Sequence, residues 1–94
     1  MKIGSALKYA RKKSGLKQNE AARCVGISQT YISQIETDSK MPSMQIIQSI
    51  CDCYKAPLAL VLWRSLSEND IKKNKLKTYR ELKPVVDNLI EQFF

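Results

Sequence analysis

The chain has no histidine at all, and only three glycines and three prolines among its 94 residues. The sequence also shows no pair of carboxylates at a pocket-like spacing, no glycine-rich loop for phosphate and no nucleophile with a nearby base. We therefore expect that the protein is not an enzyme, and we assign no catalytic residue, metal ligand or cofactor. The scarcity of glycine and proline, together with the absence of alternating β-branched runs, predicts an all-α fold.

Cysteine is scarce too, and its three copies do not form a recognisable framework. Cys24, Cys51 and Cys53 are an odd set without a second metal-like cluster, so neither a disulfide framework nor a zinc site is indicated. Cys51 and Cys53 would lie on different faces of one helix, and we interpret them as core residues in a reducing cytoplasm. The longest apolar run, residues 56–63, is too short for a bilayer span, and no basic start of a secretory signal precedes it. We expect a soluble, cytoplasmic protein without membrane contact.

Positive charge is abundant, with a formal net charge of +7. Residues 1–40 hold eight Lys/Arg against three Asp/Glu, giving +5, whereas residues 41–94 hold eight against six, giving +2. Such an excess can neutralise phosphates and release counterions, which indicates an anionic partner. Solubility alone is the alternative, and charge by itself does not separate DNA from RNA or a membrane.

Residues 18–37 contain the most informative pattern, because apolar and small residues recur there at two helical periods with one glycine between them. Ala22 suits the closest approach of two crossing helices, and Gly26 suits a turn with positive φ. Ser28 can cap the next helix with its hydroxyl. The residues that would share one core are Ala21, Val25, Ile27, Ile32 and Ile35. The second helix then presents a polar outer face, as in a helix-turn-helix.

From Ile3 to about Leu62, the chain closely resembles the Xre/Cro-type helix-turn-helix family of phage and bacterial repressors. The resemblance includes an entry helix closed by Gly15 and implies a bundle of five helices. It also implies that Arg11, which we expect to stay solvated, pairs near the surface with Glu36 as part of the scaffold. Ala21 departs from the larger aliphatic residue usual at its position, and the loop after Glu36 lacks the frequent glycine.

The helical spacing predicts further elements on both sides of this motif. A first helix should span residues 4–13, Ser43 should cap a fourth, and Pro57 should lie in the first turn of a fifth. We expect a DNA-binding domain over residues 1–66 and a helical extension over residues 67–94. A capping box at Ser67 predicts a sixth helix up to residue 82, and Pro84 is expected to start a new short one. The apolar extension should pack on its own domain, form a dimer contact, or do both.

The resemblance also assigns positions that touch DNA. Along the third helix, five polar residues are the expected base readers: Ser28, Gln29, Thr30, Ser33 and Gln34. Gln29 and Gln34 are the strongest of these, because an amide can both accept from and donate to adenine. Residues expected to hold phosphates or support the contact are Lys17, Gln18, Asn19, Tyr31 and Lys40. Residues expected to maintain the scaffold are Arg11, Ala22, Gly26 and Glu36.

These observations favour a sequence-specific regulator that binds double-stranded DNA. A single recognition helix makes few base contacts, so we expect a homodimer that reads an inverted-repeat operator and acts as a repressor. Such a protein would be encoded by a bacterium or phage and would lie on the nucleoid. An antitoxin-like regulator with a protein partner at the C-terminal helices is one alternative. An RNA-binding or pure interaction module is another, although the chain lacks a basic-aromatic stacking platform.

Overall fold

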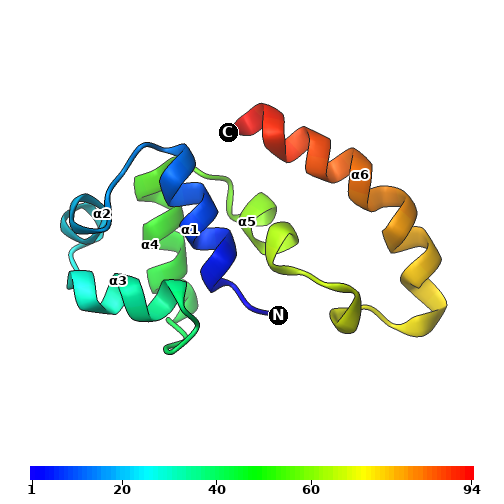
Figure 1. The fold of residues 1–94 in the computed structure, drawn as a ribbon, viewed down its shortest axis with the longest axis horizontal. Coiled ribbons are helices and arrows are strands. Elements are labelled where there is room, and N and C mark those ends of the chain that lie inside the picture. The colour runs from blue at the N-terminus through cyan, green and yellow to red at the C-terminus, as the bar shows by residue number, and fades with distance from the viewer.

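The computed structural model describes all residues from Met1 to Phe94, and every regular element in it is a helix, as the sequence predicted. The α-helices are α1 (Gly4–Lys13), α2 (Gln18–Val25), α3 (Gln29–Glu36), α4 (Met44–Tyr54), α5 (Leu58–Ser65) and α6 (Leu76–Phe93). Two short 3-10 helices, η1 (Glu68–Asp70) and η2 (Lys73–Lys75), lie between α5 and α6. Figure 1 shows α2 and α3 at one end of the molecule and α6 at the other, with α1, α4 and α5 between them.

The turn between α2 and α3 follows from two local signals. Gly26 ends α2 in the left-handed region with φ of 84°, a conformation that costs glycine least. Two residues later, the Ser28 hydroxyl accepts a hydrogen bond of 3.0 Å from the backbone N–H of Tyr31 and caps α3. Ser43 caps α4 in the same way through the N–H of Ile46. The predicted turn and both predicted caps are therefore present.

A single apolar core joins the first five helices. Its largest fully buried side chains are Ile3, Leu7, Ile32, Ile35, Ile47, Ile50 and Val61. α2 contributes only two small residues to this core, Ala21 and Ala22, while Val25 and Ile27 are partly buried at its edge. The core expected from the two helical periods is thus present, and its α2 side is built mainly from alanine.

The first helix approaches the end of α3 closely at Gly4. A Cβ at this position would lie 2.5 Å from the carbonyl oxygen of Ile35 and 2.7 Å from that of Glu36. The Gly4 N–H donates to the Asp38 carboxylate at 3.0 Å, and Asp38 itself takes a left-handed φ of 61°. Asp38 therefore adopts the left-handed conformation in the turn after α3, where the sequence has no glycine.

The C-terminal extension differs from the sequence prediction. Ser67 precedes only the short η1, and α6 begins at Leu76. Pro84 lies inside α6 and does not start a new helix. A proline in this position removes one backbone hydrogen bond, but α6 packs on the rest of the chain on both sides of it, through Tyr79 and Ile90. Packing therefore keeps the helix continuous.

α6 folds back against α1 and α5 along one face. Trp63 of α5 packs on Tyr79 with ring centroids 5.6 Å apart and donates to the Asp87 carboxylate at 3.2 Å. At the other end of α6, the Tyr9 and Phe94 rings meet edge to face at 5.6 Å. Of the alternatives left open for the extension, packing on its own chain is therefore present.

A second face of α6 has no partner in the structure. Four large apolar side chains on it are between 47% and 66% exposed, and we call them the α6 stripe: Leu82, Val85, Leu89 and Phe93. No single helix in the chain combines the length and apolar composition needed to cross a membrane. Helices α4 and α5 do so only when taken together, and they are bent by 113° at their junction.

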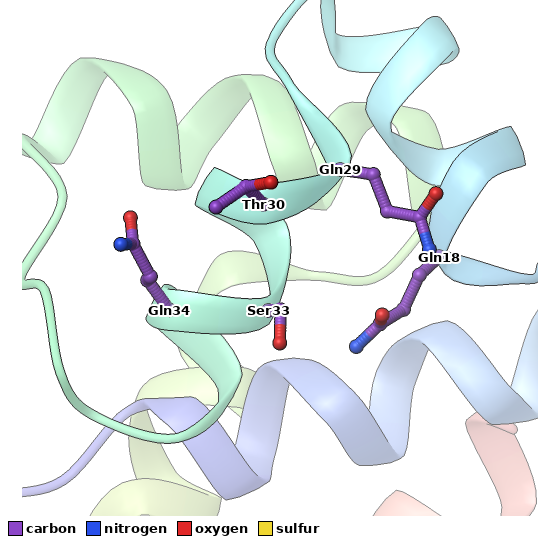
Figure 2. Close-up of a pocket in the computed structure, with 5 residues that line it drawn as sticks. All are labelled: Gln18, Gln29, Thr30, Ser33 and Gln34. Carbon is purple, nitrogen blue, oxygen red and sulfur yellow. The ribbon is translucent and has the colours of Figure 1, made fainter.

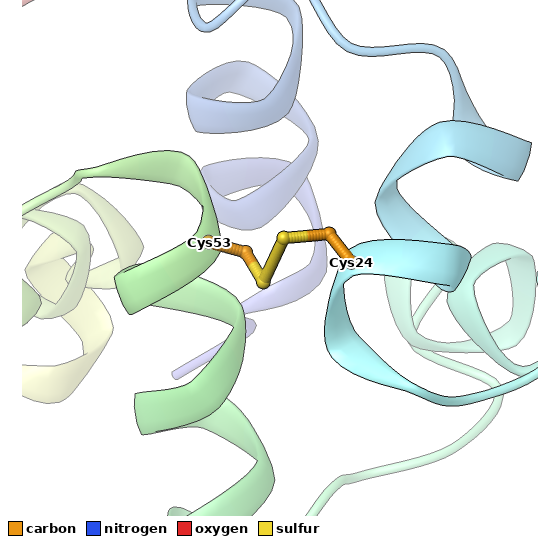
Figure 3. The surroundings of a disulfide bond; sticks show 2 residues. All are labelled: Cys24 and Cys53. Atoms are coloured by element: carbon orange, nitrogen blue, oxygen red, sulfur yellow. A yellow bond between two sulfur atoms is a disulfide. The ribbon is translucent and has the colours of Figure 1, made fainter.

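The cysteine interpretation needs a correction. Cys51 is fully buried, as expected for a core residue. Cys24 and Cys53, however, form a disulfide between α2 and α4, with their Cα atoms 6.1 Å apart (Figure 3). They lie at the surface of the helix pair and not in the core, since Cys24 is exposed and Cys53 is half-buried. Sequence spacing failed to find this pair because the cysteines are 29 positions apart and are brought together only by the packing of α2 against α4.

Candidate DNA-binding surface

Five polar side chains surround one shallow hollow on the outside of α3. They are Gln18, Gln29, Thr30, Ser33 and Gln34, and the hollow has a volume of about 310 Å³ without any apolar lining residue. Figure 2 shows Gln18, from the start of α2, beside Gln29, with Gln34 farther along α3 and Ser33 between Gln34 and this pair. Four of the five residues expected to read bases thus share one surface.

This polarity follows from how α3 is held. Ile32 and Ile35 are 1% exposed and fix one side of the helix in the core. With 3.6 residues per turn, the opposite side of α3 carries four polar residues, Gln29, Thr30, Ser33 and Gln34. The result is a row of amide and hydroxyl groups with no competing charge in the row, which suits hydrogen bonding to base edges.

Ser28 and Tyr31, two residues expected to contact DNA, do not line the hollow. The Ser28 hydroxyl oxygen is occupied by the Tyr31 N–H, and Ser28 does not line the hollow. Its hydroxyl hydrogen stays free to donate to a ligand. Tyr31 is half-buried against the core, with its ring at the edge of the motif and outside the hollow. The structure therefore places Ser28 as a cap and Tyr31 as a packing residue.

A buried network holds the start of α2 against the end of α3. The Arg11 side chain donates to both carboxylate oxygens of Glu36, from Nε at 2.6 Å and from Nη2 at 3.1 Å. Its Nη1 donates to the Leu16 carbonyl at 2.8 Å. The Gln18 amide donates to the same Glu36 carboxylate at 3.1 Å. Glu36 thus orients a residue of the hollow, a role that sequence reasoning missed, and leaves one Gln18 N–H and its oxygen free.

The location of this ion pair corrects the prediction. Arg11 was expected to stay solvated and the pair to lie near the surface, but both residues are buried. The hydrogen bonds to Glu36 raise the pKa of the Arg11 guanidinium, so it is charged at all ordinary pH values. Burial, followed by the Glu36 charge, also raises the pKa of the nearby Tyr54 phenol to about 12. The pair is therefore an internal brace of the scaffold.

Exposed basic and polar groups lie beside the hollow. Lys17 and Asn19 flank Gln18 at the start of α2, where the Lys17 N–H is taken by the Glu20 carboxylate at 2.9 Å. Lys40 lies in the loop after α3, and its N–H donates to the Gln34 carbonyl. Neither lysine side chain forms an ion pair within the chain. Both are free to meet phosphates at the rim of the hollow.

The structure contains no group of three or more His, Cys, Asp or Glu side chains that could hold a metal ion. The chemistry available at the hollow is accordingly that of amides, hydroxyls and lysine ammonium groups. Such groups donate to phosphates and exchange hydrogen bonds with base edges.

Sequence comparisons identify the family of this chain. Residues 7–61 match a family model described as helix-turn-helix. A 49-residue stretch, 52% of this chain and 54% of the other, is 41% identical to the ImmF control region 10 kDa protein of Bacillus phage phi105. A 60-residue stretch, 64% of this chain, is 33% identical to the transcriptional regulator ClgR of Mycobacterium tuberculosis and covers 54% of it. The chain thus spans about half the length of the curated relatives it matches.

Solved structures agree with the fold. The crystal structure of the clp gene regulator ClgR from Corynebacterium glutamicum superposes with a TM-score of 0.62 at 32% identity, covering 64% of this chain and 78% of that one. A second ClgR structure from the same organism gives a TM-score of 0.62 over 95% of this chain and 83% of that one. At 24% identity, the second match concerns the fold alone. These relatives are regulators and a control-region protein, which agrees with the expectation of a DNA-binding regulator that is not an enzyme.

Proposed function

Because the chain belongs to the helix-turn-helix family, we propose that it is a transcriptional regulator that binds double-stranded DNA in a sequence-specific way, with α3 in the major groove. The observation that carries this proposal is the hollow lined by Gln18, Gln29, Thr30, Ser33 and Gln34. An amide can accept and donate at once along the major-groove edge of adenine, and the threonine methyl group can contact that of thymine. Gln29 and Gln34 are the proposed principal base readers, and the hydroxyls of Ser28, Thr30 and Ser33 add contacts.

The phosphate contacts surround these base readers. Lys17, Gln18 and Asn19 lie at the start of α2, where backbone N–H groups and the helix dipole favour an anion. Lys40 lies on the opposite side of α3, after its C-terminal end. Contacts on both sides of α3 would set its depth and angle in the groove without adding sequence preference. Tyr31 supports this arrangement by packing α3 against the core.

The active form we propose is a homodimer that reads an inverted repeat. One α3 offers only a few base contacts, each worth about 1 to 3 kcal/mol, which gives little discrimination among genomic sites. A two-fold dimer places two copies of α3 about one DNA turn apart and doubles the discrimination. Binding across a promoter would exclude polymerase, so repression is the simplest outcome. Such a complex would be cytoplasmic and would lie on the nucleoid.

The α6 stripe is the proposed dimer contact. Its four side chains form one exposed row on a helix whose other face is already packed on the domain. Exposed rows of this kind on a small protein mark contact sites, and α6 lies at the end of the molecule away from α3 (Figure 1). Residues 1–66 would then form the DNA-binding domain, and residues 67–94 the dimerisation element.

Selection of duplexes from a random pool tests DNA reading directly. The wild type should enrich a two-fold symmetric site, and the Gln29→Ala/Gln34→Ala double variant should lose the sequence preference at fixed salt. Gln45→Ala, which removes an exposed glutamine of α4 outside the hollow, serves as the matched control and should select the same site as the wild type. An unchanged preference in the double variant would refute the base-reading assignment. Competition with RNA and single strands would show whether duplex DNA is the preferred ligand.

Sedimentation tests the dimer contact. Leu89→Lys places a charge in the middle of the α6 stripe and should shift the protein to monomer. Asn88→Lys adds the same charge at the neighbouring exposed position outside the stripe and should leave the dimer intact. A Leu89→Lys variant that remains dimeric would show that the dimer contact lies elsewhere.

The same stripe supports one alternative function. An antitoxin-like regulator would keep the DNA-binding surface and cover the stripe with a different protein. A wild type that is monomeric at micromolar concentration, yet captures the product of a neighbouring gene through the stripe, would favour this alternative. Loss of that capture in Leu89→Lys, with retention in Asn88→Lys, would locate the partner on α6.

A further inference from the structure

The Cys24–Cys53 disulfide encloses the recognition helix. Cys24 is the seventh of eight residues in α2, and Cys53 is the tenth of eleven in α4. The covalent loop between them contains the Gly26 turn, all of α3 and the four hollow residues that α3 contributes. Figure 3 shows the bond spanning the gap between the two helices at their C-terminal ends. Any change in this bond therefore acts on the part of the chain that faces DNA.

The apolar side chains that α2 buries are small. Its buried side chains are those of two alanines, Ala21 and Ala22. Val25, at the end of the helix, is only half-buried. By contrast, α4 is fixed in the core by residues as large as Ile47 and Ile50. Burial of apolar area is a main source of attachment between helices, so the hydrogen bond from Gln18 to Glu36 and the disulfide add to the attachment of α2. The disulfide adds a covalent link between α2 and the C-terminal end of α4.

The bond is open to exchange with thiols in solution. Cys24 is exposed and Cys53 is half-buried, so a small thiol can reach the Cys24 sulfur. The third cysteine, Cys51, is fully buried, and burial raises the pKa of its thiol to about 11. A buried, protonated thiol does not attack disulfides, so Cys51 does not compete for either partner. The pair therefore forms and breaks as a unit.

A regulator acts beside DNA, in a compartment that contains glutathione-type thiols, where protein disulfides are mostly transient and redox-sensing. We propose that the Cys24–Cys53 pair is a redox-responsive link: its disulfide holds α2 and α3 in the arrangement that binds DNA, and its reduction loosens them. The link between redox state and DNA binding rests on the proposed function, whereas the effect of the bond on the helix pair does not.

The reaction is a two-electron thiol–disulfide exchange. The thiolate of a low-molecular-weight thiol attacks the exposed Cys24 sulfur, a mixed disulfide forms, and Cys53 leaves as a thiolate that takes up a proton. A second thiol then attacks the outer sulfur of the mixed disulfide, which releases Cys24 as a thiol and the small molecule as its own disulfide. The small disulfide is the oxidant in the reverse direction, and atoms and electrons balance in both.

The test compares one protein in two redox states, with no substitution needed. The full chain is equilibrated in glutathione buffers of graded ratio, acid-quenched and alkylated, and its free thiols are counted by mass. We expect three free thiols at the reducing end and one at the oxidising end. Because the bond closes a loop of about thirty residues in a small domain, reduction should lower Tm by roughly 10 to 20 °C. Binding to duplex DNA of mixed sequence, at fixed salt, should weaken roughly fivefold or more on reduction.

Variants separate the pair from general effects of the reductant. Cys24→Ser/Cys53→Ser should match reduced wild type and should not respond to the glutathione ratio. Cys51→Ala, which keeps the pair, should retain the full response in Tm and DNA binding. Three free thiols at every ratio, or equal Tm in both states, would overturn the link. A Tm difference with equal DNA affinity would overturn its control of binding, and absence of DNA binding in both states would count against the proposed function while the Tm result still tests the bond.

Discussion

Arg11 and Glu36 form an ion pair of 2.6 Å between Nε and Oε2 that is almost completely removed from solvent, with side chains 8% and 4% exposed. The Glu36 carboxylate also accepts from the Gln18 amide, so one group links α1, α2 and the end of α3. A buried pair of this kind is costly to break, because the remaining charge has no water to replace its partner. The buried Arg11–Glu36 pair thus helps to orient the side chains of the hollow.

Removing one member of this pair should destabilise the protein severely. Glu36→Ala leaves the Arg11 guanidinium buried without its partner, and we expect a loss of about 3 to 5 kcal/mol in the free energy of unfolding, measured by urea titration. Glu68→Ala is the matched control, because the Arg80–Glu68 pair has the same 2.6 Å separation with side chains 60% and 52% exposed. That substitution should leave stability unchanged within error. Equal losses in the two variants would show that burial does not decide the strength of the brace.

Replacing Gly4 of α1 with alanine should destabilise the protein, although the same replacement stabilises most helices. Alanine usually stabilises a helix by about 1 kcal/mol relative to glycine, but a Cβ at Gly4 would meet the carbonyl oxygens of Ile35 and Glu36. Backbone oxygens cannot move aside like a flexible side chain, so Gly4→Ala should cost about 1 to 3 kcal/mol on thermal or urea unfolding. Ser5→Ala, at the next and exposed position, should be close to neutral. A stabilised Gly4→Ala would mean that α1 is not held tightly against α3.

The first five helices could be predicted from sequence because their signals are local. Gly26 and Ser28 impose a turn and a cap through their own backbone and side chain, and the spacing of Ile32 and Ile35 decides which side of α3 is polar. The same periodicity identified four of the five side chains around the hollow, and the resemblance added Gln18.

The features that sequence missed all depend on contacts between distant segments. Pro84 is a local signal for a helix end, but packing at Tyr79 and Ile90 outweighs the one hydrogen bond that it removes. The sequence around Arg11 is typical of a surface position. Arg11 is buried because the fold brings Glu36, twenty-five positions away, into contact with it. The Cys24–Cys53 bond likewise exists only once α2 and α4 lie side by side. A local sequence pattern does not show which distant segments come into contact in the fold.

Salt dependence should separate phosphate contacts from base contacts. Replacing a lysine that neutralises one phosphate reduces the slope of log K against log salt by about 0.9, so Lys17→Ala and Lys40→Ala should each lower the slope by nearly one. Neither variant should change which duplex is preferred, because phosphate contacts carry no sequence information. Lys77→Ala, an exposed lysine of α6, is the control of equal charge change and should leave the slope as it is. A sequence preference that changes with Lys40→Ala would instead assign that lysine to a base.

Acid should release α6 from the domain before it unfolds the core. Although burial raises the pKa of Asp87, the hydrogen bonds from Lys83 and Trp63 outweigh it, with help from the Arg64 charge, and hold that pKa below its usual value. A carboxylate with a lowered pKa in the folded state stabilises the fold fully above its unfolded pKa, near 3.9, and loses that contribution as pH falls through the folded value.

Trp63 is the only tryptophan of the chain and donates to Asp87, so its fluorescence reports this contact. We expect its emission to change as the pH falls below about 3.9, at a higher pH than the loss of helical circular dichroism. Asp87→Asn keeps an acceptor oxygen for the indole N–H but has no proton to gain, so the emission should no longer follow pH in this range. Glu91→Gln removes a carboxylate from the same helix away from Trp63 and should leave the titration of the emission unchanged. An Asp87→Asn protein with the wild-type pH profile would assign the acid response to another carboxylate.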